Sequence, residues 1–326
     1  MDGLKNTKHK PMFAAIDLGT NSNRLLIVDE NCVPVYRDVK HVALGEGLAE
    51  AGCFCSKAME RAICSFMDFA EMMQLYNVVS YRAIATAACR MSANTEAFRT
   101  EVKKSSGVEV EVISEFEEAR LTLKGACLNA PKEPKYLFVY DLGGGSTEVS
   151  FATNTATPEI LETYSIPLGA RNATEMYQLQ DYDAAGVLAL ETEVKRQLVD
   201  FLAKVRTYPD FTDAAVIATS STPLRLAAWI LKQPGYDKFA ADGKCVAVAD
   251  LDAVIAEILP LTYEERAKSE YVGANRAKIF VAACVIFRTI YQALGAREVV
   301  ASLKGAQEAI VSELMASGGS GSTGND

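Results

Sequence analysis

The chain has 326 residues, of which 49% are hydrophobic, and a net charge of −9 at pH 7. This is enough for two ordinary soluble domains, whereas an acidic chain is a poor general ligand for nucleic acid. The longest apolar run, Ile279–Phe287, is too short to cross a bilayer, and the N-terminus, MDGLKNTKHKPM, lacks a signal core. Eight cysteines without a CxxC pair indicate reduced thiols, and only two histidines are present. We expect a cytoplasmic protein with no membrane or nucleic-acid partner.

The segment Phe13–Asp29, FAAIDLGTNSNRLLIVD, predicts a tight hairpin in which Asp-Leu-Gly-x-x-Ser separates two apolar strands. Asp17 ends the first strand, and Ser22 follows the glycine turn. A glycine in such a turn leaves no Cβ between the backbone amides and an incoming anion. The pattern therefore predicts a loop that can hold phosphate.

Strands and helices alternate after this hairpin, which is typical of an α/β lobe. Arg90 lies on the turn that follows one of these strands. Strands are expected over Val33–Ala43, Val78–Thr86 and Val108–Ile113, and helices over Ser56–Tyr76 behind a serine cap and after a second cap at Asn94.

The segment Ser114–Glu118, SEFEE, predicts the start of another helix. Ser114 and Glu117 have the spacing of a capping box, which gives Glu117 a structural role. Glu118 lies about 100° further round the helix and in its first turn, where the helix dipole favours an ionised carboxylate. Glu118 can therefore serve as a general base, although a solvated surface glutamate is the more common case.

A second hairpin, Leu137–Ala152, LFVYDLGGGSTEVSFA, repeats the first motif. Asp141 ends its incoming strand, Gly144 and Gly145 lie in its turn, and Glu148 lies on its outgoing strand. The two carboxylates can converge on the loop mouth, and carboxylates with substrate phosphates are the usual ligands of Mg²⁺. Two phosphate loops on one chain imply two lobes that face one cleft.

The proline-containing stretch 129–135 is the best candidate linker between the lobes. We expect lobes at 12–128 and 135–304, a C-terminal helix at 305–316 that packs back on the first lobe, and flexible tails at 1–11 and 317–326. The turn Thr219–Arg225 opens a helix whose free amides can bind an anion. The remaining elements expected in the second lobe are strands over Glu159–Pro167, Ala214–Ala218 and Val299–Leu303, and helices over Ala184–Val205, with Leu188 facing inward, and Ala274–Leu294.

Five segments, taken together, resemble the exopolyphosphatase and guanosine pentaphosphate phosphatase (Ppx/GppA) family in its short, two-domain form. They occur in family order over about Met12 to Leu314 and read DLGTNSNRLLI, ISEFEEAR, DLGGGSTE, IPLGAR and TSST. The EEAR segment separates this family from sugar kinases, actin and heat-shock ATPases of similar fold. The resemblance implies an α/β protein with duplicated ribonuclease-H-like domains, as in the actin-like ATPase superfamily, and an interlobe cleft.

The resemblance also implies Mg²⁺-dependent hydrolysis of terminal phosphoanhydride bonds without a covalent intermediate, and it suggests a homodimer. By matching position, Glu118 is the catalytic base, while Asp141 and Glu148 are catalytic acids that hold or position the metal and the attacking water. Matches to phosphate-contacting positions are Asn21, Ser22, Arg90, Gly144, Gly145, Ser146 and Thr147, with Asp17, Arg171, Ser220 and Thr222 as secondary candidates.

Three positions depart from the family pattern and bear on rate and chain-length preference. Ser221 replaces a glycine, Lys278 replaces an aspartate, and Gln307 replaces an arginine. The expected activity is release of orthophosphate from inorganic polyphosphate. Two alternatives stay open: hydrolysis of pppGpp to ppGpp, and a non-catalytic regulator that binds polyphosphate or guanosine penta- or tetraphosphate.

Overall fold

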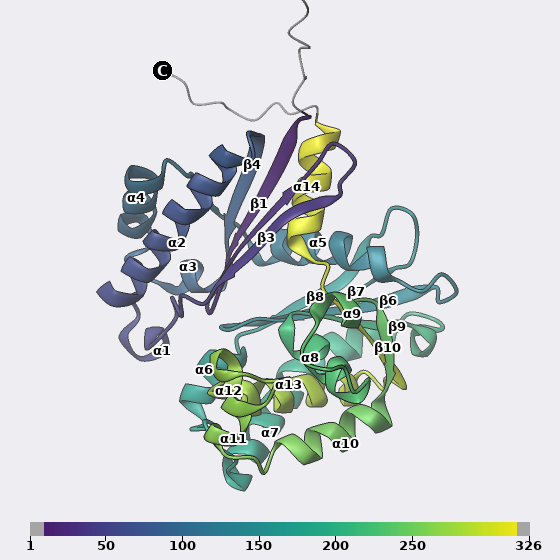
Figure 1. Ribbon diagram of the computed structural model, residues 1–326. Coiled ribbons are helices and arrows are strands. Elements are labelled where there is room, and N and C mark those ends of the chain that lie inside the picture. The colour runs from purple at the N-terminus through teal and green to yellow at the C-terminus, as the bar shows by residue number, and fades with distance from the viewer. Residues whose placement is uncertain (1–9, 318–326) are drawn as a thin grey trace, which may run out of the picture.

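The computed structural model describes residues 10–317, and the two predicted tails lie almost wholly outside that range. The described chain forms two α/β lobes, each built on one mixed sheet (Figure 1). Within residues 10–317, no helix has both the length and the apolar character needed to span a membrane.

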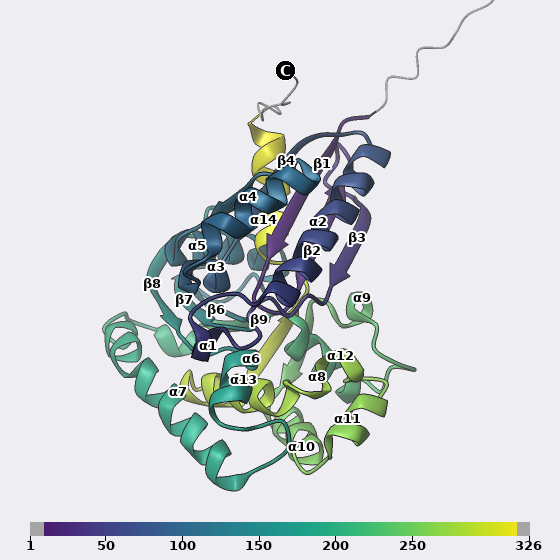
Figure 2. The same cartoon turned by 90° about the vertical axis from the view of Figure 1, so that its left-hand side faces the viewer.

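The first lobe has a five-stranded sheet. Its strands are β1 (Met12–Leu18), β2 (Asn23–Val28), β3 (Pro34–Lys40), β4 (Val78–Ala85) and β5 (Val110–Val112), and the helices in this part of the chain are α1 (Leu48–Ala51), α2 (Ser56–Leu75), α3 (Ala87–Met91), α4 (Thr95–Ser106) and α5 (Glu115–Ala126). Helices α2 and α4 lie side by side over one face of this sheet (Figure 2), where Phe66, Phe69 and Phe98 are fully buried.

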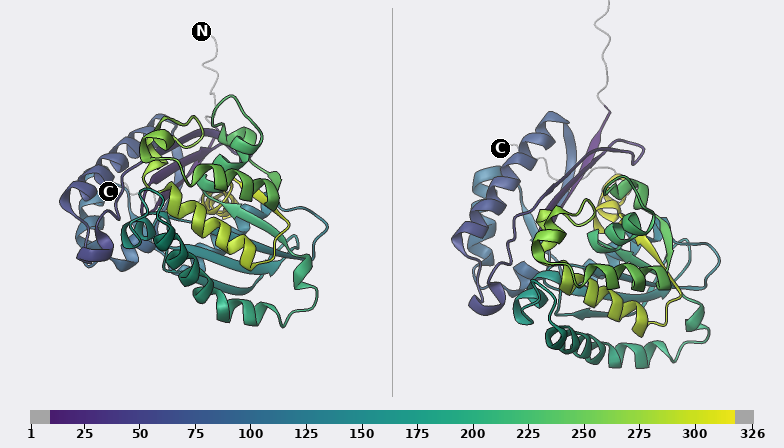
Figure 3. Two further views of the ribbon diagram at one scale, coloured as in Figure 1. Left: turned by 90° about the horizontal axis from the view of Figure 1, so that it is seen from below. Right: turned by 60° about the horizontal axis from the view of Figure 1, so that its bottom comes forward.

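The second lobe has a six-stranded sheet. Its strands are β6 (Tyr136–Leu142), β7 (Thr147–Thr153), β8 (Ile160–Ile166), β9 (Ala215–Thr219), β10 (Lys244–Ala247) and β11 (Glu298–Ser302). The helices that follow β8 are α6 (Ala170–Met176), α7 (Ala184–Val205), α8 (Ser221–Ile230), α9 (Lys238–Ala241), α10 (Val248–Ile258), α11 (Tyr263–Lys268), α12 (Ala274–Ala277), α13 (Phe280–Ala293) and α14 (Ala306–Ala316). The apolar faces of α7 and α13 pack together and contribute to the large core on one side of this sheet (Figure 3).

The two sheets repeat one topology. The first sheet has the strand order β3-β2-β1-β4-β5. The second has the equivalent order β8-β7-β6-β9-β11, followed by the additional edge strand β10. In both, the central strand is antiparallel to its hairpin partner and parallel to the strand on its other side. The predicted pair of ribonuclease-H-like domains is confirmed, and both hairpins form where the sequence placed them.

Two helices cross between the lobes. Helix α14, the last of the chain, packs on β1 of the first sheet, where Ile310 and Val311 are buried with Phe13 (Figure 1, yellow). Helix α5 lies against α14 and places Leu123 on the sheet of the second lobe, against Val139. The helix that carries Glu118 is therefore held between the two sheets.

The crossing of α5 and α14 depends on Gly125. A Cβ built at this residue would lie 1.8 Å from the carbonyl oxygen of Gly305, the residue before α14. Alanine favours a helix over glycine by about 1 kcal/mol, but overpacking costs about 1–3 kcal/mol, so we expect Gly125→Ala to destabilise the protein. Thermal unfolding measures this effect, with Glu115→Ala on the exposed start of α5 as the control. A variant as stable as the wild type would show that this backbone contact is not close in solution.

Four local predictions were wrong. Ser56 is the first residue of α2 rather than its cap, and Asn94 caps no amide because its side chain bonds the backbone of Phe54. Leu188 is 64% exposed, since the inward stripe of α7 runs through Val187 and Leu190 instead. The predicted helix over 274–294 is broken into α12 and α13 at residues 278–279.

Candidate active site

The two glycine loops close with the same hydrogen bond. Gly19 N donates to Ser22 O at 3.1 Å, and Gly143 N donates to Ser146 O at 3.0 Å. Each loop joins the two antiparallel strands of its hairpin, so both loops lie at the same end of equivalent strands. The duplication therefore extends from the sheets to the conformation of the loops.

In each loop, a carbonyl accepts a hydrogen bond from the backbone of another segment of the same lobe. Gly45 N donates to Thr20 O at 2.9 Å, and Arg171 N donates to Gly144 O at 2.8 Å. Within the described chain, the amides of Thr20, Asn21, Gly144 and Gly145 make no hydrogen bond. Backbone N–H groups arranged in this way form an anion-binding concavity.

The loops of the two lobes touch each other. A Cβ built at Gly144 would lie 3.1 Å from Thr20 Cβ and 3.2 Å from the Asn21 nitrogen, and one at Gly145 would lie 2.7 Å from Thr20 Oγ1. Side chains at these two glycines would hold the lobes apart. Between the loops lies a small cavity of about 50 Å³ with lining residues from both lobes.

Three carboxylates line this cavity: Glu118, Asp141 and Glu148. Asp141 and Glu148 are directly opposite each other in the β6–β7 ladder, so their side chains lie on the same face of the sheet. Glu148 Oε1 accepts hydrogen bonds from Ser146 Oγ at 2.6 Å and Ser165 Oγ at 3.1 Å. The structure thus brings Glu118 together with two acids that lie 23 and 30 residues further along the chain, beyond the linker.

Glu118 reaches the cavity from the first turn of α5 and is only 8% exposed. Arg90 Nη1 donates to Glu118 Oε2 at 2.8 Å and to the carbonyl of Ile113 at 3.1 Å. Burial, and then the neighbouring Glu148, raise the pKa of Glu118 well above its usual value, against the opposing effect of Arg90. A carboxylate with a raised pKa, held by one arginine, is suited to accept a proton near neutral pH.

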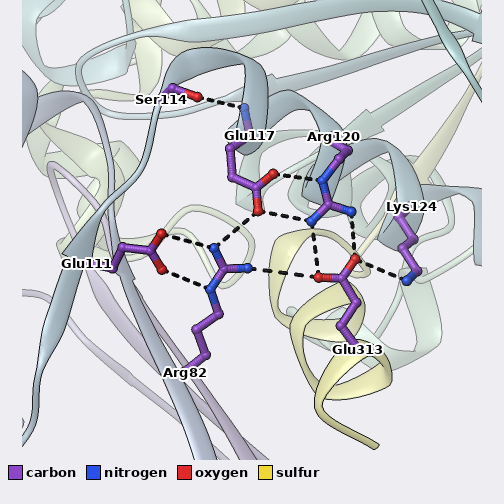
Figure 4. Close-up of polar contacts among 7 residues, drawn as sticks. All are labelled: Arg82, Glu111, Ser114, Glu117, Arg120, Lys124 and Glu313. Atoms are coloured by element: carbon purple, nitrogen blue, oxygen red, sulfur yellow. Dashed lines mark hydrogen bonds and ion pairs between the residues drawn. The ribbon is translucent and has the colours of Figure 1, made fainter. Parts of the chain in front are cut away.

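Glu117, the neighbour of Glu118, belongs to a different environment. Figure 4 shows its carboxylate accepting from Arg120 Nε at 2.7 Å and Arg82 Nη2 at 3.1 Å, while Arg120 also pairs with Glu313 of α14. Ser114 Oγ accepts from Glu117 N at 3.2 Å, so the serine cap is confirmed. The predicted capping box is wrong, because the Glu117 carboxylate pairs with arginines instead of the Ser114 backbone.

Two of the three acids in the cavity could share a divalent cation with substrate phosphates, because within residues 10–317 no group of three or more His, Cys, Asp or Glu side chains is placed to hold a metal ion. Burial raises the pKa of Asp141, and raises that of Glu148 to about 7, with the charge of Asp141 adding to the latter shift. Buried carboxylates that repel one another are stabilised in their ionised form by a cation, and oxygen ligands are those that Mg²⁺ prefers. Asp141 and Glu148 are therefore a suitable donor pair for Mg²⁺, with Glu118 beside them.

The first lobe has an arginine where the second has Glu148. Arg24 is paired in register with Asp17, as Glu148 is with Asp141, and its Nη1 donates to Asp17 Oδ2 at 2.7 Å. Arg24 lines the cavity together with Asp17. Sequence reasoning named Asp17 and missed Arg24, although an alignment of the two hairpins places Arg24 at the position of Glu148.

Other predicted phosphate-binding residues divide into two groups. Asn21, Ser22, Gly144, Gly145, Ser146 and Ser220 line the cavity. Within the described chain, the cavity is not lined by Thr147, Thr222, Arg171 or Arg90. Arg90 does, however, donate a hydrogen bond to Glu118, which lines it. Thr147 alternates with Glu148 along β7, and its hydroxyl donates to the carbonyl of Leu168 at 2.7 Å, so the predicted contact of Thr147 with phosphate stays a prediction.

Ser220 joins β9 to α8 in a backbone conformation that glycine usually adopts, with φ 96° and ψ −176°. Its Oγ is buried and has no hydrogen-bond partner in the described chain. Ser221, which replaces the family glycine, is the first helical residue and carries none of this strain. An unpaired hydroxyl on a strained turn at the start of a helix is available to a bound anion.

The small cavity adjoins a second one of about 470 Å³, and Arg24, Asp141, Ser220 and Arg276 line both. Its further cationic residues are Arg37, Arg225 and Lys238. Nε of Arg276 is buried without a hydrogen-bond partner, and Arg276 makes no ion pair within residues 10–317. The same lining also contains Asp38, Asp237 and Glu308, and Arg37 is paired with Glu308 at 2.6 Å, so the cation that the second cavity leaves unpaired beside the acids is Arg276.

Of the other two departures, Gln307 lines the second cavity and Lys278 lines neither. Gln307 donates from Nε2 to the carbonyl of Ala15 at 3.0 Å and so ties α14 to β1. Lys278 is exposed and lines neither cavity. Lys304 donates to Asn129 Oδ1 at 3.0 Å near the linker. Neither lysine lines a described cavity, and the cations of the second cavity come from other segments, among them Arg225 and Arg276.

Comparison with known proteins shows which family has this site. A family model described as "Ppx/GppA phosphatase family" matches residues 26–317. The chain belongs to the Ppx/GppA phosphatase family. Exopolyphosphatase 2 of Mycobacterium tuberculosis is 27% identical over 296 residues, which cover 87% of this chain and 91% of that protein. The predicted resemblance, and with it an enzyme of the phosphoanhydride hydrolase type, is confirmed.

Solved structures of the Ppx/GppA family have the same fold. The Aquifex aeolicus family member is 25% identical with a TM-score of 0.76, over 94% of this chain and 98% of that one. An exopolyphosphatase from Cytophaga hutchinsonii is 22% identical with a TM-score of 0.86, over the same shares of the two chains. The two-lobed arrangement described above is therefore the Ppx/GppA arrangement.

Proposed function

We propose that this protein is an exopolyphosphatase that releases orthophosphate from the ends of inorganic polyphosphate, using Mg²⁺ and a water activated by Glu118. One observation carries the proposal: a buried acid cluster between the two glycine loops opens into a larger cavity, whose lining has cationic and acidic side chains and includes Arg276, a cation without an ion pair in the described chain. The small cavity suits one terminal phosphoryl group. The larger one suits the rest of a polyanion.

The residues present divide the chemistry between them. Amides of the two glycine loops and Arg24 bind the oxygens of the terminal phosphoryl group, where charge develops in the transition state. Glu118 accepts a proton from water as the new oxygen–phosphorus bond forms and the bond to the bridging oxygen breaks. The shortened polyphosphate leaves with its negative charge stabilised by Arg276. When bound by Asp141 and Glu148, Mg²⁺ would neutralise phosphate charge.

Polyphosphate fits the second cavity better than a guanosine nucleotide does. Tyr236 and Phe239 are aromatic residues of its lining, and a cation lies over each ring: Arg225 Cζ is 4.0 Å from the Tyr236 centroid, and Lys238 Nζ is 5.2 Å from the Phe239 centroid. A purine that stacked on the same face of either ring would have to displace one of these cations. Arg225 and Arg276, whose Nε atoms lack partners, favour a chain of phosphates instead, whereas Arg37 is already paired with Glu308 at 2.6 Å.

Phosphate release from purified protein tests this proposal. Short polyphosphate, long polyphosphate and pppGpp are compared side by side, with Mg²⁺ and with EDTA. We expect Mg²⁺-dependent release that is faster from polyphosphate than from pppGpp. Faster turnover of pppGpp would favour the second hydrolase activity, and tight binding of either compound without phosphate release would favour a regulator.

A further inference from the structure

Arg171 reaches across the interlobe boundary. It belongs to α6 of the second lobe, is 9% exposed, and donates from Nε at 3.0 Å and also from Nη2 to Oδ1 of Asn21 in the loop of the first lobe. Its nearest acid is Glu175, at 3.8 Å. Arg171 lines neither cavity in the described chain, so its contact is with the loop and not with the space that a phosphate would fill.

The contact determines which way the Asn21 amide points. A side-chain amide has an oxygen that only accepts and a nitrogen that only donates, and the two are nearly equal in size. With two N–H groups of Arg171 on Oδ1, the opposite orientation would place the amide NH₂ against a cationic donor. Nδ2 is therefore directed to the other side, where it lies 3.3 Å from Ser22 Oγ and where both residues line the small cavity.

The position of Arg171 is itself set by the loop of the second lobe. Its backbone N donates to Gly144 O at 2.8 Å, Ala170 N donates to Gly143 O at 2.9 Å, and Asn172 Nδ2 donates to Gly145 O at 2.8 Å. The first turn of α6 is thus fixed on the triple-glycine loop. Arg171 therefore links the two glycine loops: its backbone contacts the loop of the second lobe, and its guanidinium contacts Asn21 in the loop of the first lobe.

We propose that Arg171 is a positioning residue that completes the phosphate site of the first lobe only when the two lobes meet, by directing the Asn21 Nδ2 donor at the terminal phosphoryl group. This inference rests on the proposed function. An amide nitrogen can donate twice, and Nδ2 has one partner, Ser22 Oγ, among residues 10–317. Arg171 acts through Asn21 and does not bind phosphate itself, which replaces the expectation drawn from the sequence.

A double-mutant cycle tests this inference. Arg171→Met removes the donors, Asn21→Ala removes the amide, and the pair of changes is combined in one chain. We expect each single change to lower kcat/KM for polyphosphate by about tenfold, as for the loss of a hydrogen bond to a charged group, and the double variant to be no worse than Asn21→Ala. Arg171→Lys, which keeps a cationic donor, should recover part of the loss. Arg196→Met, an exposed arginine of the same lobe, is the control.

Three outcomes would overturn the inference. Additive losses in the double variant would make Arg171 an independent phosphate ligand. If folded Arg171→Met had a lower melting temperature but unchanged kcat/KM, Arg171 would be only a structural link between the lobes. If neither the melting temperature nor kcat/KM changed, Arg171 would have neither a structural nor a positioning role. Calorimetric titration of the wild type, the two single variants and the double variant with orthophosphate measures the same coupling in binding affinity. A wild-type protein that releases no phosphate would refute the proposed function, while coupled losses of orthophosphate affinity would still support the role of Arg171.

Discussion

Replacement of Glu118 by glutamine is expected to lower the rate of phosphate release by about 10²–10⁴, the usual contribution of a positioned general base. Glutamine keeps the shape of the side chain and can still accept a bond from Arg90 through its oxygen. It cannot take a proton from water. The loss should therefore fall on kcat, with a smaller effect on KM.

The same change is expected to stabilise the protein above neutral pH. Since the pKa of Glu118 is raised in the folded state, folding favours the protonated form, and ionised Glu118 destabilises the fold at pH values above that raised pKa. The destabilisation fades as the pH falls and is absent below the unfolded pKa. Glu118→Gln should consequently melt higher than the wild type at pH 8, by at least about 2 °C for each kcal/mol recovered, and with little difference near pH 4.

Glu117→Gln is the matched control, because the adjacent carboxylate has the opposite shift. Its bond with Arg120 lowers the pKa of Glu117, so its ionised form stabilises the folded state, and this stabilisation is lost as the pH falls. At pH 8 this variant should melt at or below the wild-type temperature and lose far less activity. If Glu118→Gln kept full turnover, or if it melted lower than Glu117→Gln at pH 8, Glu118 would not be a buried base.

Local sequence patterns predicted the elements of this site better than their surroundings. Both hairpins could be predicted because strand, glycine turn and strand are adjacent in sequence, and the repeat of Asp17 at Asp141 indicated two lobes. The first-turn position of Glu118 could be predicted for the same reason. Its burial could not, because α5 is covered by a sheet that begins after the linker and by a helix at the end of the chain.

The positions and partners of charged side chains from distant segments could not be predicted from the sequence pattern either. Arg171 was expected to reach a phosphate or a carboxylate; it pairs with Glu175 at 3.8 Å, but its hydrogen bonds go to the Asn21 amide in the other lobe, which the sequence did not indicate. Arg225 ends the predicted anion-binding turn and Lys238 lies in a segment without a motif, and only the folded chain places both in one cavity. The orientation of the Thr147 hydroxyl could not be predicted from its place beside the glycine turn, since it donates to the carbonyl of Leu168.

Arg276→Met is expected to lower kcat/KM for polyphosphate by about tenfold to a hundredfold, the range for removal of one or two charge-assisted hydrogen bonds. Burial, and then the charge of Arg24, lower the pKa of Arg276 to about 9, so the guanidinium is still cationic at pH 7. Its Nε is buried without a partner, and the described chain supplies no acid to pair with it. Such a charge destabilises the free protein and is compensated when an anion binds.

Arg276→Met should therefore raise the melting temperature of the free protein at pH 7 while it weakens substrate binding, and polyphosphate without Mg²⁺ should stabilise the wild type more than the variant. Lys278→Met is the control, because Lys278 lies two residues further along, is exposed and lines neither cavity. Unchanged kcat/KM in Arg276→Met, or equal stabilisation of both proteins by polyphosphate, would mean that the second cavity does not receive the chain. A gain in stability combined with a loss of affinity is the expected behaviour of a cation that the fold leaves unpaired for its substrate.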